Sequence, residues 1–118
     1  MLVESTQFRE PSDSERRLLA LLAAQAPALG FGWLEGLFVS EMDDGGMGSL
    51  RLVPRGVSSS GRIFGNKVAE YQFTDSDGVE VLASLNVDQD GQPFELDVWK
   101  TDFSPLIRIP GTDAVKAE

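Results

Sequence analysis

Apolar and polar residues alternate with a period of two over three stretches in the second half of the chain. The stretches run from Ala69 to Thr74, from Val79 to Asp88 and from Phe94 to Trp99. This period is typical of strands that have one buried face and one open face. Two further stretches, Trp33–Met42 and Leu50–Val53, predict two more strands from their β-branched, aromatic and other apolar residues.

The N-terminal part of the chain predicts one helix, from Asp13 to Ala26. Ser12 and Glu15 have the spacing of a capping box, and leucines and alanines form one apolar stripe at helical spacing. Pro27 stops the helix. We therefore expect a single α+β domain over residues 1–118, with the N-terminal helix packed on a mostly antiparallel sheet of about five strands in meander order.

The parity of the apolar residues selects the turn in each of the last two hairpins, because a slip of one residue would turn every side chain to the other face. The first hairpin requires a three-residue loop at Ser76–Gly78, and the second a two-residue turn at Asp90–Gly91. The first loop pairs Phe73 with Val81, Tyr71 with Ala83, and Ala69 with Leu85. The second turn pairs Val87 with Phe94, Leu85 with Leu96, and Ala83 with Val98.

These registers predict both faces of the sheet. The expected core is Leu18, Leu21, Leu22, Leu37, Val39, Tyr71, Phe73, Val79, Val81, Ala83, Leu85, Phe94, Leu96 and Val98. Outside it, residues 1–10 are expected to form a loose arm and residues 111–118 a frayed tail. The Gly- and Ser-rich stretch 54–66 predicts a mobile loop.

The absence of cysteine and histidine narrows the chemistry of the 118-residue chain. Without these residues the protein lacks disulfides, thiolate nucleophiles and the commonest general base and metal ligand. The N-terminal sequence MLVESTQFRE has no apolar run like that of a secretory signal, and no segment approaches the ~20 apolar residues of a membrane span. We expect a cytoplasmic protein that is not an enzyme and carries no cofactor or metal.

The net charge of −9 is concentrated in one segment. Residues 70–99 hold eight acidic residues and no Lys or Arg. Such a field repels nucleic acid and anionic lipid and attracts basic partners, although a solvated face that keeps the protein soluble is the plainer interpretation. The predicted open face gathers Glu70, Leu82, Glu95, Asp97 and Trp99, and we interpret these five residues as a partner-binding surface. Trp99 could instead lie buried under the tail that holds Phe103 and Ile107.

Two chemical alternatives use the same acids. Asn86, Asp88 and Asp90 match the start of a calcium loop, but both flanks read as strands, and an extended strand cannot wrap an ion. Glu95 and Asp97 lie about 7 Å apart on one strand face, a carboxylate separation that suits a small hydrolase. Ser49, Lys67, Ser84 and Lys100 are isolated candidates for a nucleophile.

The run MGSL at residues 47–50 and the block FTDSDGVEVLASLNVDQDGQPFELDVWKTDFSPLI at residues 73–107 resemble a family of short bacterial domains of unknown function. The opening FREPSDSERRLLALL is similar to the start of the same family. The resemblance implies no catalytic residues. By analogy in size and acidity, it suggests immunity proteins that neutralise toxins. The leading hypothesis is that the protein is a binding domain for a basic protein. One alternative is a homo-oligomer that uses Leu82 and Trp99 as its self-contact, and the other is the small hydrolase.

Overall fold

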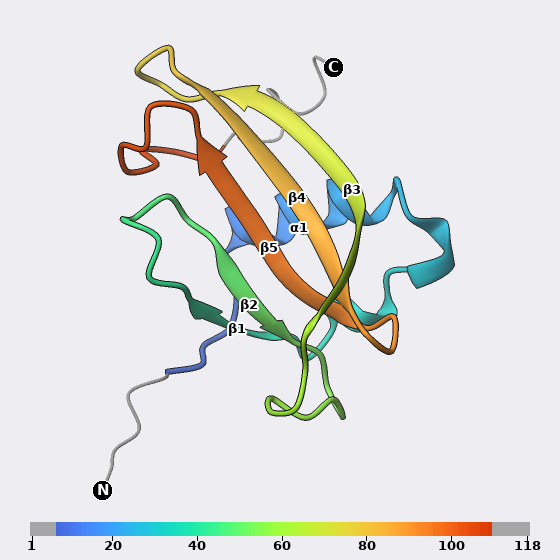
Figure 1. Ribbon diagram of the computed structural model, residues 1–118. Coiled ribbons are helices and arrows are strands. Elements are labelled where there is room, and N and C mark those ends of the chain that lie inside the picture. The colour runs from blue at the N-terminus through green and yellow to red at the C-terminus, as the bar shows by residue number, and fades with distance from the viewer. Residues whose placement is uncertain (1–6, 110–118) are drawn as a thin grey trace, which may run out of the picture.

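The computed structural model describes residues 7–109, which form one helix, two short 3-10 helices and one five-stranded sheet (Figure 1). The predicted tail at 111–118 and residues 1–6 of the predicted N-terminal arm lie outside the described residues. The described end of the arm is not loose, because Arg9 exchanges two backbone hydrogen bonds with Val39. In chain order the elements are α1 (Asp13–Ala23), η1 (Pro27–Leu29), η2 (Gly32–Leu34), β1 (Phe38–Glu41), β2 (Leu50–Val53), β3 (Phe64–Thr74), β4 (Glu80–Asp88) and β5 (Pro93–Lys100).

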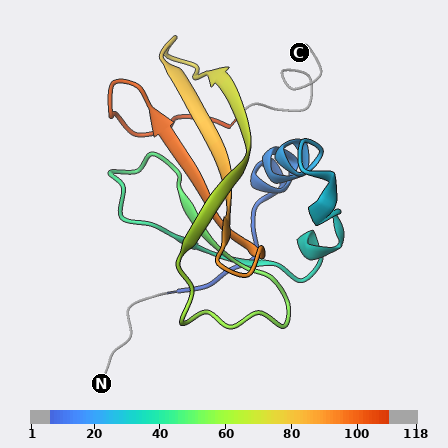
Figure 2. The same cartoon turned by 45° about the vertical axis from the view of Figure 1, so that its right-hand side comes forward.

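The sheet is antiparallel throughout and has the order β1-β2-β5-β4-β3. The predicted α+β class is confirmed, with α1 packed on one face of the sheet (Figure 2). The predicted meander holds within β1–β2 and within β3–β4–β5. It is wrong between these two units, because β2 pairs with β5 and β3 becomes an edge strand.

The helix α1 begins as predicted and ends three residues early. The Ser12 side chain accepts a hydrogen bond from the N–H of Glu15, and the Glu15 carboxylate accepts one from the N–H of Ser12, which completes the capping box. After Ala23 the N–H groups of Gln25 and Ala26 bond three residues back instead of four, so the helix tightens and stops before Pro27.

The first predicted strand is too long at its N-terminal end. Residues 32–34 form η2, and Gly36 has a φ of 74°, a left-handed conformation that a strand does not accept. Strand β1 therefore starts only at Phe38. The predicted loop at 54–66 is also too long, because β3 begins at Phe64 and the side chain of Arg62 is bonded into the fold.

The two hairpins of β3–β4–β5 use the same three-residue loop. In the first, the predicted loop and all three predicted pairs are confirmed. In the second, the predicted two-residue turn is wrong: the loop is Gln89–Gly91, and Val87 pairs with Pro93 instead of Phe94. A register shift directly after that pair restores the predicted pairs Leu85–Leu96 and Ala83–Val98. The bulge therefore absorbs the extra loop residue, and the core keeps its parity.

The core lies between α1 and the sheet. Eleven of the fourteen predicted core residues are buried, while Leu21, Tyr71 and Val79 remain half-exposed. Four further apolar residues of the core were not predicted: Leu19, Leu50, Leu52 and Ala69.

One contact links the end of the helical region to the edge strand β3. The side-chain amide of Gln25 donates to the carbonyl of Glu70 over 2.9 Å and accepts from the N–H of Glu70 over 3.1 Å. A side chain thus makes the pair of hydrogen bonds that a neighbouring strand would make.

Candidate binding face

The face of the sheet turned away from α1, here called the open face, carries the five residues predicted as a contact surface. Strand register sets Glu70, Ser84 and Asp97 in one row and Gln72, Leu82 and Trp99 in the next, as predicted. Glu70, Asp97 and Trp99 are exposed, while Leu82 and Glu95 are half-buried. The structure therefore brings all five residues onto one surface.

Two aromatic residues lie side by side at one end of the open face. The Trp99 and Phe103 ring centroids are 6.1 Å apart, with a tilt of 58° between the rings. Trp99 is 42% exposed and Phe103 is 68% exposed. The C-terminal segment thus contacts Trp99 without covering it, so the alternative of a buried Trp99 is wrong. Together with Leu82, the register partner of Trp99, these residues form an apolar surface that we call the aromatic patch.

Phe103 occupies a backbone position that glycine holds in both hairpin turns. Its N–H donates to the carbonyl of Lys100 over 2.8 Å, just as Gly78 and Gly91 each donate to the residue three positions earlier. The φ of Phe103 is 64°, close to 84° and 81° at the two glycines. For a residue with a Cβ this conformation costs about 1–2 kcal/mol. The chain therefore accepts strain where it holds an aromatic ring in solvent.

Carboxylates surround the aromatic patch. Asp97 and Glu80 lie two positions before Trp99 and Leu82 along their strands, so they share the same face, and Asp102 precedes Phe103. Hydrogen bonds from the hydroxyl and the N–H of Ser104 lower the pKa of Asp102, so this carboxylate, already charged at neutral pH, keeps its charge further into acid. The patch is thus apolar at its centre and anionic at its rim.

Two acids of the 70–99 segment form ion pairs at the first hairpin turn, Asp75 inside the fold and Asp77 at the surface. The Lys100 ammonium, whose side chain is fully buried, lies 2.8 Å from Asp75 and 2.7 Å from Asp77. Burial alone would raise the pKa of Asp75. Hydrogen bonds from the N–H of Ile107, from Lys100 and from the N–H groups of Ser76 and Arg108 outweigh this effect and lower the pKa to about 2.

A third acid is bound inside the fold at the second turn. The guanidinium of Arg62 lies 2.8 Å from the Asp88 carboxylate, and both side chains are buried. Burial alone would raise the pKa of Asp88, but the hydrogen bonds from Arg62 and from the N–H groups of Gln92 and Asp90 lower it. Both carboxylate oxygens of Asp88 are therefore occupied, which argues against the calcium alternative.

The charge on the open face is uneven as a result. Lys67 forms a 2.7 Å ion pair with Glu70, and Arg51 lies opposite Glu95 in the register of β2 and β5. Both bases lie away from the aromatic patch. Within residues 7–109, Glu80 and Asp97, the acids of the open face beside the aromatic patch, form no ion pair with a base.

Three of the four isolated candidates for a nucleophile, Ser49, Lys67 and Lys100, have bonded partners, and Ser84 is buried in β4. The Ser49 hydroxyl accepts from the N–H of Val98 over 2.9 Å, and Lys100 is buried between two carboxylates. Within residues 7–109, no three acidic side chains group as metal ligands. In the same range, no helix is both long and apolar enough to cross a membrane.

A family comparison covers nearly all of this structure. The sequence model of the Domain of unknown function (DUF6984) matches residues 8–110. The chain belongs to the DUF6984 family. Neither the curated proteins nor the solved structures include a match. The resemblance to a family of unknown function is thus confirmed, and the matched range of the DUF6984 domain includes α1, all five strands and the aromatic patch.

Two residues of the DUF6984 domain surface were not predicted as site residues. Phe103 lies in the segment TDFS, which lacks the glycine that would mark a left-handed position. Arg51 reaches the open face only because β2 pairs with β5, a pairing that the predicted meander order did not contain. Neither residue could have been placed from local sequence patterns.

Proposed function

We propose that the DUF6984 domain is a non-enzymatic binding module whose aromatic patch and surrounding carboxylates contact a basic protein. The observation that carries this proposal is Phe103, which is 68% exposed and adopts a left-handed backbone conformation that glycine would adopt without strain. Strain of this kind concentrates at functional sites, where stability is given up for another property.

The chemistry of the patch suits a basic partner. Trp is enriched among residues that dominate binding energy, and an aromatic face attracts a Lys or Arg side chain by a cation–π interaction. Carboxylates at the rim, such as Asp97 and Glu80, would steer a cationic surface toward the rings. We expect a partner that inserts at least one Lys or Arg side chain against Trp99 and Phe103.

Inhibition of a basic toxin is the specific form of this function that we propose. An immunity-type inhibitor needs a preformed surface and no catalytic centre. An acidic face on a rigid sheet meets both requirements. Co-purification with a basic toxin encoded beside the gene, lost on Trp99→Ala, would support this form.

The test compares two charge reversals of equal size. Immobilised wild-type domain and variants capture proteins from a lysate of cells that encode the domain, and the captured proteins are quantified by mass spectrometry. The first variant carries Glu80→Lys and Asp97→Lys beside the patch. The matched control carries Glu35→Lys and Asp90→Lys, two exposed acids outside the open face.

We expect the first variant, and Phe103→Ala, to lose a basic protein that both the wild type and the control retain. Equal capture by the first variant and the control would overturn the proposal. Light scattering distinguishes the homo-oligomer alternative from binding to a basic protein. If the wild type is a dimer and the Trp99→Ala variant is a monomer, the partner is a second copy of the chain.

A further inference from the structure

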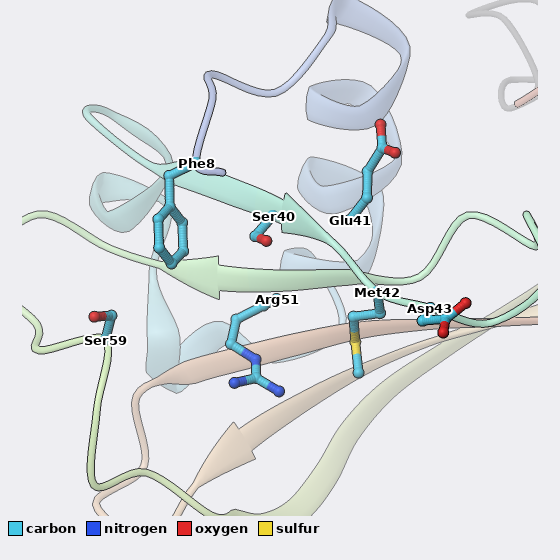
Figure 3. Close-up of a pocket in the computed structure, with 7 residues that line it drawn as sticks. All are labelled: Phe8, Ser40, Glu41, Met42, Asp43, Arg51 and Ser59. Atoms are coloured by element: carbon cyan, nitrogen blue, oxygen red, sulfur yellow. The ribbon is translucent and has the colours of Figure 1, made fainter. Parts of the chain in front are cut away.

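A second polar site lies on the open face, near the β1 edge of the sheet and away from the aromatic patch. It is an open pocket of about 510 Å³ (Figure 3). Its lining residues are Phe8, Ser40, Glu41, Met42, Asp43, Arg51 and Ser59. Ser40 and Arg51 are register partners on β1 and β2, so their side chains leave the same face of the sheet.

Arg51 is a cation without an anionic partner in the part of the chain that the structure describes. No hydrogen bond or ion pair joins its guanidinium to another residue of 7–109, and its Nε is buried without an acceptor. Buried donors are rarely left without a partner in folded proteins. The hydroxyl of Ser40 likewise has no bonded partner within this range.

The guanidinium is held in place by an aromatic ring. Its central carbon lies 5.5 Å from the centroid of the Phe94 ring, within the range of a cation–π interaction. Figure 3 shows that the Glu41 and Asp43 carboxylates of the lining point away from Arg51. Glu41 is bonded to Arg9 over 3.2 Å. The interior of the pocket therefore presents a positive group, although the protein as a whole is acidic.

We infer that this pocket binds a carboxylate that is attached to an apolar group. The guanidinium offers parallel N–H donors that match the two oxygens of a carboxylate, and the Ser40 hydroxyl offers one more. Phe8 and Met42 supply apolar contacts beside these donors. A monoanion fits better than a phosphate dianion, because Glu95 lies opposite Arg51 and the net charge is −9.

The site is independent of the proposed function, since it uses a cation at another part of the face. The carboxylate could belong to a small acid or to the C-terminus of a peptide. The probes are therefore phenylacetate and a short glycine-rich peptide that ends in phenylalanine. Each has its neutral amide as control.

Binding is followed by NMR at the backbone N–H resonance of position 51, which every variant described below retains, at constant ionic strength in chloride. We expect saturable shifts of this resonance with the carboxylates and none with the amides. Stronger binding of phenylacetate would assign a small acid, and stronger binding of the peptide a chain end. The absence of a saturable shift with both carboxylates would overturn the inference.

Three variants separate recognition from general electrostatics. Arg51→Lys should weaken binding roughly tenfold, because a lysine keeps the charge and loses the paired donors. Arg55→Lys, a matched change at an exposed arginine, should leave binding unchanged. Glu95→Gln should strengthen binding by about threefold, because it removes the one carboxylate opposite Arg51 in the register. Unchanged binding in Arg51→Lys would show that the shifts report only a diffuse charge effect and would overturn the inference.

Discussion

Two turns at opposite ends of β4 have the same sequence pattern, Asp-X-Asp-Gly, at residues 75–78 and 88–91. In each, the N–H of the first Asp donates to the carbonyl four residues later, and the glycine N–H donates back to the first Asp. Each first Asp is buried and forms an ion pair with a base that is distant in the sequence. The local backbone solution is therefore the same at both ends.

The turns differ in what the buried aspartate holds. Asp75 accepts from the N–H groups of Ile107 and Arg108, so its turn fastens the segment that follows β5. Asp88 accepts from N–H groups of its own turn, and its partner Arg62 donates to the carbonyls of Leu52 and Pro93. One turn thus depends on its aspartate for long-range contacts, and the other depends on its arginine.

This comparison shows that the acidic residues of one short segment have two different roles. Some are buried and stabilise the fold, and others lie between them in the sequence and are exposed on the surface. The first aspartates of both turns are internal, whereas Asp97 and Glu80 lie in solvent. A third turn, from Lys100 to Phe103, has the same backbone hydrogen bond and replaces the glycine by an aromatic residue. It is the turn that carries the aromatic patch.

The largest effect is expected at Lys100. Lys100→Met leaves the buried Asp75 carboxylate without its cation and should lower the free energy of unfolding by about 3–5 kcal/mol. Urea unfolding measures the change. Asp75→Asn in the same background should recover part of the loss, because it removes the uncompensated charge. A loss below about 1 kcal/mol, the value of a surface pair, would contradict the internal role of this pair.

Arg62→Met should have a smaller effect, about 3 kcal/mol, at the low end for a broken buried pair. Asp88 keeps the N–H donors of Asp90 and Gln92, which continue to stabilise its charge. The same unfolding measurement checks this value. If Arg62→Met costs more than Lys100→Met, the proposed difference between the two turns is wrong.

Stability should fall in acid, and the first turn should dominate this fall. The pKa of Asp75 in the folded state is lowered to about 2, so the unfolded chain binds its proton first. The contribution of Asp75 is therefore complete above the unfolded pKa of about 4 and is lost as the pH falls toward 2. Thermal unfolding between these values should show a shallower pH dependence in Asp75→Asn than in the wild type. Equal slopes would show that other carboxylates govern acid unfolding.

The smallest effect concerns the left-handed position of the third turn. Phe103→Gly should be more stable than Phe103→Ala by about 1 kcal/mol, because glycine adopts the positive φ without strain. Gly78→Ala should have the opposite sign and a similar size, since no atom lies within 4 Å of the added Cβ and only the backbone conformation opposes it. Equal stability of the two Phe103 variants would remove the argument from strain.

Local sequence patterns predicted the capping box, the strand faces and most of the core, because these depend on periods of 3.6 and 2. The pairing of Leu85 with Leu96 was predicted from a wrong turn, since burial of the apolar face constrains the register more than the loop does. Pairing between β2 and β5 depends on distant segments that have no local signal, so Arg51 could not be assigned to the site.

Lys100 is a different case, because a local signal did exist. It follows Val98 by two positions, so the period of the strand places it on the buried face. Lysine is almost never fully buried unless it is paired, and its partners Asp75 and Asp77 come from another hairpin turn. A prediction for Lys100 therefore required the tertiary contact as well as the period.

The amide of Gln25 on the backbone of Glu70 has a consequence for how molecules of this protein meet each other. Strand β3 is 11 residues long and borders solvent, so it could serve as a template for a foreign strand. Gln25 occupies both outward groups of Glu70 and interrupts that template. A single glutamine thereby discourages edge-to-edge polymerisation. It leaves one face of the sheet packed on α1 and the other face exposed.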